Sequence, residues 1–218
     1  MIINKDIFKK AKKKDPYLTY YYPDSVLADQ FQMIHTNLNF MMQEQKASTF
    51  LLTSPEDGDG KSTMIANLAV SMAQQKKKVL VIDANLRTPN MHEFFHTSNS
   101  NGLTDVLTER CSFHEVVHHT EIWRLDLLAS GPTPNNPVEL LGSKMMKNFL
   151  SKVKESYDVI LLDSTALHTL PDTKLLASLC DAVILVVKNG KTKAQNAAES
   201  KKMIEFSKAK LLGVILNN

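Results

Sequence analysis

Residues 54–63, with the sequence SPEDGDGKST, constrain the fold of this chain more than any other stretch. The apolar residues 49–53 come directly before them, and apolar residues recur at helical spacing from Met64 to Ala73 directly after them. A strand, a tight loop with glycines and a helix, in that order, form the sequence context of a phosphate-binding loop. The segment therefore predicts a nucleotide-binding α/β fold, and a surface turn that merely precedes a helix is the less favoured interpretation.

The residue types of this loop suit a bound anion. Glycines let the backbone approach the anion closely, and successive N–H groups at the start of the helix point at it. Lys61 adds a positive charge, and the hydroxyl of Ser62 can hold Mg²⁺. We expect a nucleoside triphosphate as the ligand, bound by Gly58, Asp59, Gly60, Lys61, Ser62 and Thr63.

The loop is nevertheless a variant of the strict motif. Pro55 stands where that motif has its first glycine, five residues before Gly60. Three acids, Glu56, Asp57 and Asp59, would also oppose a polyphosphate unless they face solvent.

Two further predicted strands, the apolar run at residues 79–82 and the strand at residues 157–162, are followed by the carboxylates Asp83 and Asp163. Residues 182–187 and 211–216 form two more such runs, and Asn217 follows the last one. Continuous apolar strands that alternate with helices predict a three-layer α/β/α fold with a mostly parallel central sheet. Ligands of such sheets bind beyond the carboxyl ends of the strands, so we expect both carboxylates to face the phosphate loop and assist Mg²⁺.

The rest of the chain is assigned more coarsely. We expect an N-terminal arm over residues 1–24 and one domain over residues 25–218, which opens with a helix at 25–42 capped by Ser25 or Asp24. Its polar face, Asp29, Gln32 and His35, is either exposed to solvent or a contact surface. Further expected elements are a small helix from 102 to 107, a strand at 122–129, a helix at 138–154 that can break at Gly142, and a polar helix at 193–206.

Bulk composition excludes several classes of function. The 218 residues carry a formal charge of only +3, and much of the basic excess is the lysine run at 9–14, so binding to nucleic acid is not required. Cys111 and Cys180 lie far apart and predict neither a disulfide framework nor a zinc site. No apolar run approaches the roughly 20 residues that span a bilayer. We expect a cytoplasmic protein that reaches the membrane, if at all, through a partner.

Four of the five tyrosines lie at Tyr17, Tyr20, Tyr21 and Tyr22, in the expected arm. Packing of this segment onto the domain is the favoured interpretation, and phosphate acceptors are the alternative.

Taken together, the loop at 54–63, the strand end with Asp83, Asn85 and Arg87, and the strand end at Asp163 resemble one family. This family is the bacterial tyrosine kinases of capsule and exopolysaccharide synthesis, a branch of the phosphate-loop ATPases. The likeness runs from about Pro23 onward. It includes TNLNF at 36–40, NLA at 67–69, GLT at 102–104, ASG at 129–131 and GVILN at 213–217.

The resemblance implies Mg²⁺-dependent transfer of phosphate from ATP to protein tyrosine. By position, Lys61 would contact the phosphates, Ser62, Asp83 and Asp163 would serve Mg²⁺, and Asp83 would also activate the attacking oxygen. Asn85 and Arg87 would belong to the catalytic set, and Asn217 would lie near the base. The resemblance further implies a transmembrane polysaccharide co-polymerase as activator, with a homo-oligomer formed through the first helix.

The departures from the family pattern keep two alternatives open. Asn85 stands where a second Asp is expected, residues 164–166 differ from the usual Thr-Pro-Pro, and the ring-forming Glu and Arg residues are replaced by Asp29, Gln32 and His35. The family's C-terminal tyrosine cluster is also missing before residue 218. One alternative is a nucleotide-binding regulatory module of the polysaccharide machinery with little transfer activity. The other is a partition-type or division-type ATPase.

Overall fold

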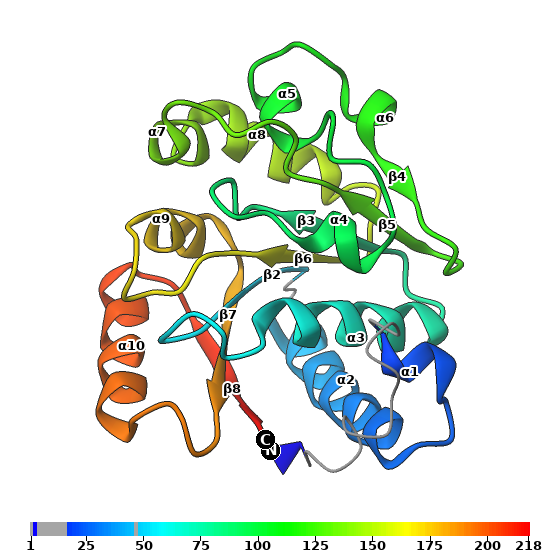
Figure 1. Cartoon of the computed structure of the whole chain (residues 1–218), viewed down its shortest axis with the longest axis vertical. Coiled ribbons are helices and arrows are strands. Elements are labelled where there is room, and N and C mark those ends of the chain that lie inside the picture. The colour runs from blue at the N-terminus through cyan, green and yellow to red at the C-terminus, as the bar shows by residue number, and fades with distance from the viewer. Residues whose placement is uncertain (1, 4–16, 46–47) are drawn as a thin grey trace.

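The computed structural model describes residues 2–3, 17–45 and 48–218, and within them the chain forms one sheet covered by helices on both faces (Figure 1). The strand order is β1-β8-β7-β2-β6-β3-β5-β4. Neighbouring strands run parallel except β4, which is antiparallel to β5. The strands are β1 (Ile2–Ile3), β2 (Thr49–Thr53), β3 (Val79–Asp83), β4 (His118–His119), β5 (Leu125–Leu128), β6 (Val159–Asp163), β7 (Ala182–Lys188) and β8 (Leu211–Asn217).

The helices divide into two layers. One layer contains α1 (Leu18–Tyr21), α2 (Val26–Gln45), α3 (Lys61–Gln74) and α4 (Met91–Phe94). The other layer contains α5 (Leu103–Leu107), α6 (Phe113–Val116), α7 (Pro137–Leu141), α8 (Lys144–Val153), α9 (Asp172–Leu179) and α10 (Ala194–Phe206). The expected three-layer α/β/α fold with a mostly parallel sheet is confirmed.

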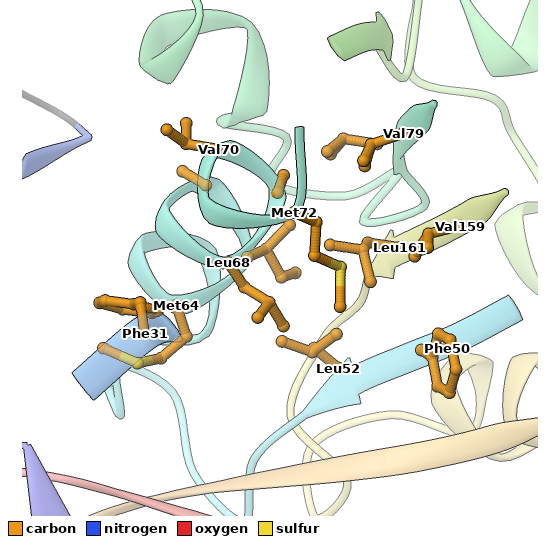
Figure 2. Close-up of a cluster of buried hydrophobic side chains, with 14 of the residues drawn as sticks. Phe31, Phe50, Leu52, Met64, Leu68, Val70, Met72, Val79, Val159 and Leu161 are labelled. Atoms are coloured by element: carbon orange, nitrogen blue, oxygen red, sulfur yellow. The ribbon is translucent and has the colours of Figure 1, made fainter. Parts of the chain in front are cut away.

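The central strands contribute side chains to two separate cores. Phe50 and Leu52 face the layer of α2 and α3, while Leu51 faces the opposite layer, as the alternation of a strand requires. Figure 2 shows Met72 of α3 beside Leu161 on the first of these faces. Strands buried on both sides explain why continuous apolar runs, rather than alternating ones, marked them in the sequence.

Several predicted elements are confirmed with small shifts. The helix expected at 25–42 is α2, and the Ala28 N–H donates a 3.2 Å hydrogen bond to Ser25 Oγ, so Ser25 is the cap. The helix expected at 138–154 is α7 and α8, which are separated at Gly142. The strand expected at 122–129 is shorter, because Arg124 takes the left-handed φ of 68° and the ladder of β5 starts only after it.

The polar face of α2 was expected to be either exposed to solvent or a contact surface. Asp29 and Gln32 are exposed, as both alternatives require, but His35 is buried, so the prediction is wrong for this residue. Only 4% of His35 is accessible, and burial together with the charge of Lys77 lowers its pKa. His35 therefore belongs to the packed side of the helix.

The boundary of the expected arm at residue 24 stays a prediction, and the lysine run at 9–14 lies outside the described residues. What is described of this segment packs on the domain. Ile2–Ile3 pairs in parallel with Leu216 and Asn217 of β8, and the Thr19 N–H donates to Asn67 Oδ1 of α3 at 3.1 Å. Across the described part of the chain, every helix is too short or too polar to cross a membrane.

Candidate active site

The loop between β2 and α3 has the compact backbone of an anion-binding turn. Gly58 and Gly60 take left-handed φ values of 76° and 92°. A Cβ on Gly60 would lie 2.3 Å from Nδ2 of Asn217, so only glycine fits there. Helix α3 starts at Lys61, directly after this turn, so its free N–H groups open toward the loop.

Lys61 and Ser62, the first two residues of α3, point to different partners. The buried Lys61 amine donates to Ser54 Oγ at 3.2 Å and lies 3.7 Å from a carboxylate oxygen of Asp57. The Ser62 hydroxyl donates to Asp163 Oδ2 at 2.9 Å. The hydroxyl of the phosphate loop and the carboxylate at the end of β6 are thus already in contact.

Asp83 and Asp163 stand side by side at the ends of neighbouring strands, where they are register partners. Neither is accessible to solvent. Asp83 accepts hydrogen bonds from the N–H groups of Asn85, Asn90 and Met91. Burial raises the pKa of Asp83 above its usual range, and the neighbouring Asp163 carboxylate raises it further.

Burial also raises the pKa of Asp163, and the hydrogen bond from Ser62 and the charge of Lys61 oppose that rise. Two adjacent buried carboxylates repel each other, so a divalent cation between them would relieve a real electrostatic cost. The donors are two carboxylates and a hydroxyl, all oxygen atoms, which suits Mg²⁺ because it keeps several water or phosphate ligands of its own. Within residues 2–3, 17–45 and 48–218, no group of three or more His, Cys, Asp or Glu gathers as a complete metal cage.

The other predicted catalytic residues are engaged with the protein. The Asn85 side chain donates to the Thr88 carbonyl at 2.9 Å and accepts from the Thr88 N–H at 3.2 Å. Arg87 donates from Nε to Asp172 Oδ2 of α9 at 2.8 Å, and this contact raises its pKa. Asn85 therefore lies next to Asp83, whereas Arg87 is turned toward α9.

Asn217 contacts the phosphate loop itself, because its amide donates to the Asp59 carbonyl at 2.8 Å. Thr63 is the third residue of α3, and its carbonyl accepts from Asn67. The predicted binding residues therefore meet in one place, from the loop, the start of α3 and the end of β8.

The three loop acids were expected to face solvent if the loop is to bind a polyphosphate. In the structure only one of them is exposed. Asp59 has no accessible surface, accepts from Thr192 Oγ1 at 3.1 Å and lies 3.4 Å from the Lys191 amine. Glu56 accepts from the Asn196 amide. Asp57 is exposed. Asp59 is thus held by the segment between β7 and α10, and Glu56 by the first turn of α10.

Sequence reasoning missed this segment as part of the site. Lys191 also donates to the Asp57 carbonyl, and Lys188 donates to the Gly58 carbonyl at 3.3 Å. The available signal was the basic and hydroxyl cluster directly after an apolar strand, at the carboxyl edge where ligands bind. We call residues 188–196 the clasp.

Comparison with known proteins gives one consistent family. The family described as "AAA domain" matches residues 48–211. The chain is 40% identical over 195 residues to "Tyrosine-protein kinase YwqD" of Bacillus subtilis (strain 168). This alignment covers 89% of this chain and 82% of that protein. Among solved structures, the kinase domain of the Escherichia coli tyrosine kinase ETK is similar with a TM-score of 0.93 and 26% identity, over 100% of this chain and 88% of that one.

A more distant structural likeness concerns the fold alone. The septum site-determining protein MinD of Pyrococcus horikoshii OT3, solved with Mg-ADP, superposes with a TM-score of 0.68 at 23% identity, over 78% of this chain and 70% of that one.

Proposed function

Because this chain belongs to the bacterial tyrosine-protein kinases built on an AAA domain, we propose that it transfers the γ-phosphoryl group of ATP to protein tyrosine. The family resemblance extends the proposal to regulation of capsular or exopolysaccharide synthesis. The single observation that supports it most is the 2.9 Å hydrogen bond from Ser62 to Asp163, with Asp83 as the neighbour of Asp163.

Phosphoryl transfer requires positioning and neutralisation of charge more than covalent chemistry by the protein. In the proposed mechanism the backbone N–H groups of the loop and the Lys61 amine hold the phosphate oxygens. Ser62, Asp163 and Asp83 would hold Mg²⁺, which would supply positive charge to offset the negative charge of the phosphate groups.

Asp83 is the proposed acceptor of the phenolic proton. Its carboxylate lies at the end of β3 beside Asp163, at the edge of the sheet where the phosphates would bind. Asn85 and Arg87 are proposed to support this strand end. Asn85 would do so through its backbone bond to Asp83, and Arg87 through its ion pair with Asp172.

The decisive experiment incubates the purified chain with labelled ATP, Mg²⁺ and a polymer of glutamate and tyrosine. A parallel reaction adds the cytoplasmic segment of the cognate co-polymerase. We expect label on tyrosine that is lost in Lys61→Met, whereas Lys147→Met, an exposed change on α8 outside both the loop and the clasp, keeps full transfer. Transfer that survives in Lys61→Met would contradict the proposal.

A regulatory module that binds nucleotide without transferring phosphate remains the second candidate. It is favoured by Asn85, because an amide committed to Thr88 supplies no charge to the metal site. Binding of Mg-ATP with no label on tyrosine would select this candidate. The third interpretation, a division-type ATPase, has only a similarity of fold in its support.

The proposed setting follows from the same family. We propose a cytoplasmic site of action, where ATP is available, a transmembrane co-polymerase as activator, and tyrosine-bearing proteins rather than nucleic acid as substrates. A homo-oligomer through α2 would have to form without the arginine contacts that Gln32 and His35 replace, and His35 is buried.

A further inference from the structure

The amino edge of the parallel sheet, opposite the candidate active site, carries basic side chains around one exposed aromatic ring. The turns before β3 and β5 meet there, because Val79 is the register partner of Leu125 and its N–H donates to the Arg124 carbonyl at 2.8 Å. Figure 1 shows the end of α3 and the start of β5 on the same side of the molecule, away from the phosphate loop. We call this surface the basic edge, and it consists of Lys76, Lys77, Lys78, Trp123 and Arg124.

We propose that the basic edge docks on the surface of a membrane that contains anionic lipid. A partner was expected from the sequence to provide the route to a membrane, and here the chain itself makes the contact. The proposed phosphoryl transfer does not use this face of the molecule, so the inference stands or falls independently of the kinase function.

Trp123, the only tryptophan of the chain, supplies the aromatic group. The residue is 69% accessible, although burial of so large a ring would be favourable. Tryptophan is enriched where a membrane meets water, because its ring is apolar while its N–H can stay hydrated. An exposed ring on a turn can therefore enter the headgroup region without any rearrangement of the core.

The four cations of the basic edge are available to anionic headgroups. Lys76, Lys78 and Arg124 are exposed, and Lys77 is partly exposed. Within the described part of the chain, none of the four forms an ion pair with a carboxylate. Each Lys or Arg held near an anionic membrane surface adds to the attraction, and cations beside an interfacial aromatic ring are typical of membrane-surface contacts.

The carboxylates that adjoin the basic edge are engaged with the protein. Asp158 accepts from the backbone N–H of Lys78 at 2.7 Å. Glu121, two residues before Trp123, accepts from the Tyr17 hydroxyl. These two acids reduce the positive charge of the face but leave the cations in excess.

The two turns are tied to each other through Arg124. Its guanidinium lies over the Trp123 ring, 4.3 Å from the centroid, and its Nη1 donates to the Lys76 carbonyl at 2.8 Å. Lys76 and Arg124 also take left-handed φ values of 66° and 68°, which glycine would adopt more easily. Lys76 follows the end of α3, where helices commonly carry glycine. Charged residues at such positions have a conformational cost, and attraction to an anionic surface would offset it.

Nucleic acid would also attract these cations, but the environment of the ring favours a membrane. Proteins that bind single strands stack bases on the faces of aromatic rings. One face of Trp123 is already covered by Arg124, whereas insertion of a ring edge among headgroups does not require a bare face. Docking through the amino edge also directs the phosphate loop away from the membrane, where ATP and protein substrates can reach it.

The test measures binding of the full chain to vesicles of phosphatidylcholine alone or mixed with phosphatidylglycerol. Fluorescence reports on Trp123 itself, and sedimentation gives the bound fraction. One variant carries Lys76→Gln, Lys77→Gln and Lys78→Gln, and Trp123→Ala removes the ring. The matched control removes three exposed lysines from α8 and α10, through Lys147→Gln, Lys201→Gln and Lys202→Gln. Every variant keeps the lysine run at 9–14, so differences among them report on the substituted positions.

We expect Trp123 emission to shift to shorter wavelength with the anionic vesicles and to stay unchanged with phosphatidylcholine alone. Loss of the three lysines of the basic edge should weaken binding roughly 100-fold, at about fivefold for each cation. Trp123→Ala should also bind more weakly, and the matched control should bind like the wild-type chain. A higher salt concentration should release the protein, because it screens the charges.

Several results would overturn the inference. These are equal binding to both kinds of vesicle, an unchanged Trp123 emission, or an equal loss in the two triple-lysine variants. Binding to DNA or RNA that the same variants lose, without binding to anionic vesicles, would assign the basic edge to nucleic acid instead. Thermal unfolding verifies that each variant is folded, and the two vesicle compositions test the wild-type chain by itself. Transfer to the polymer of glutamate and tyrosine should be unchanged in all variants, which separates this inference from the kinase function.

Discussion

Asn85 is the side chain on which the strength of the proposed catalysis depends. Its amide donates to Thr88 and accepts from Thr88, and its backbone N–H donates to Asp83. The residue thus stabilises the turn after β3, but it brings no charge to the two carboxylates at the strand ends.

Asn85→Asp should raise turnover with saturating Mg²⁺ and lower stability without it. The new carboxylate adds a negative charge to the metal site and so strengthens Mg²⁺ binding. Without Mg²⁺ the same carboxylate repels Asp83 and no longer donates a hydrogen bond to Thr88, which should lower the free energy of unfolding by roughly 1–3 kcal/mol. Thermal unfolding with and without Mg²⁺, beside steady-state kinetics, checks both effects. Asn85→Ala is the control and should show no gain in turnover. If Asn85→Asp also shows none, Asn85 is not the limiting residue.

Ser62→Ala should reduce kcat/KM by about 10-fold to 100-fold, the value of a hydrogen bond to a charged group and of one metal ligand. The Mg²⁺ concentration needed for half-maximal activity should rise. Ser62→Thr retains the hydroxyl 2.9 Å from Asp163 and should stay close to wild type. An unchanged Mg²⁺ titration in the alanine variant would show that the Ser62 hydroxyl does not bind Mg²⁺.

Lys191→Met should weaken ATP binding about tenfold while kcat at saturating ATP changes little. Without the amine, Asp59 is a buried carboxylate with one fewer cation beside it, and the loop that must receive the phosphates becomes more negative. The KM for ATP of Lys191→Met and of the exposed Lys193→Met separates this effect from a general loss of lysine charge. Equal KM values in both variants would contradict it.

Strand-end side chains were predictable from the sequence, and contacts from distant segments were not. Asp83 and Asp163 follow apolar runs, and parallel strands bring their carboxyl ends to one edge. The pairing of Asp59 with Lys191 spans 132 residues, and local patterns carry no signal for it. His35 has the spacing of an exposed face, yet its neighbours in the fold bury it.

Among the secondary-structure elements, β2 is fixed at its first residues by one carboxylate. Asp181, just before β7, accepts from the Ser48 and Thr49 N–H groups at 2.9 Å each, and Lys154 at the end of α8 donates to it at 2.7 Å. Burial acts to raise the pKa of Asp181, but the Lys154 and backbone hydrogen bonds outweigh it and lower the pKa to about 2. The strand that leads into the phosphate loop is thus held at its start by charge.

This contact predicts the response of stability to acid. The pKa of Asp181 in the folded protein lies below the ordinary carboxyl pKa of about 4. The stabilisation that ionised Asp181 gives the fold is therefore complete above about pH 4 and is lost as the pH falls through the folded pKa of about 2. Asp181→Asn should cost roughly 2 kcal/mol at neutral pH and only a small part of that near pH 2. Urea unfolding at both pH values measures the difference, and an equal loss at both would contradict the ionic origin.

The elements that sequence patterns missed are short. Strand β1 has two residues and is defined only by its pairing with β8, and β4 exists only as the antiparallel partner of β5. Helix α9 follows Pro171 in a stretch whose apolar residues are too few for a clear helical period. Longer elements with sustained periodicity, such as α2 and α3, were predicted within a few residues.

At the scale of the complete molecule, the order of the strands brings the parts of the candidate site together. Strand β2 lies between β7 and β6, so the phosphate loop has Asp163 on one side and the clasp on the other. A nucleotide in this position contacts segments from the first half of the domain and from the second half, and binding should therefore stabilise the entire fold.

Mg-ATP at about 100 times its Kd should add about 2.7 kcal/mol to the free energy of unfolding. For a chain of this size that corresponds to an increase in Tm of roughly 5–10 °C. Calorimetry and thermal unfolding of wild type against Lys61→Met provide the measurement and its control. A flat titration with wild type would contradict nucleotide binding and every function proposed from it.

The ion pair between the buried Asp59 and the exposed Lys191 has an evolutionary consequence. A lone charge without accessible surface is costlier than either the pair or two neutral side chains. Among relatives of this chain, the acid at the first position and the base at the second should appear and disappear together, and a lineage that has lost one should carry a replacement at the other.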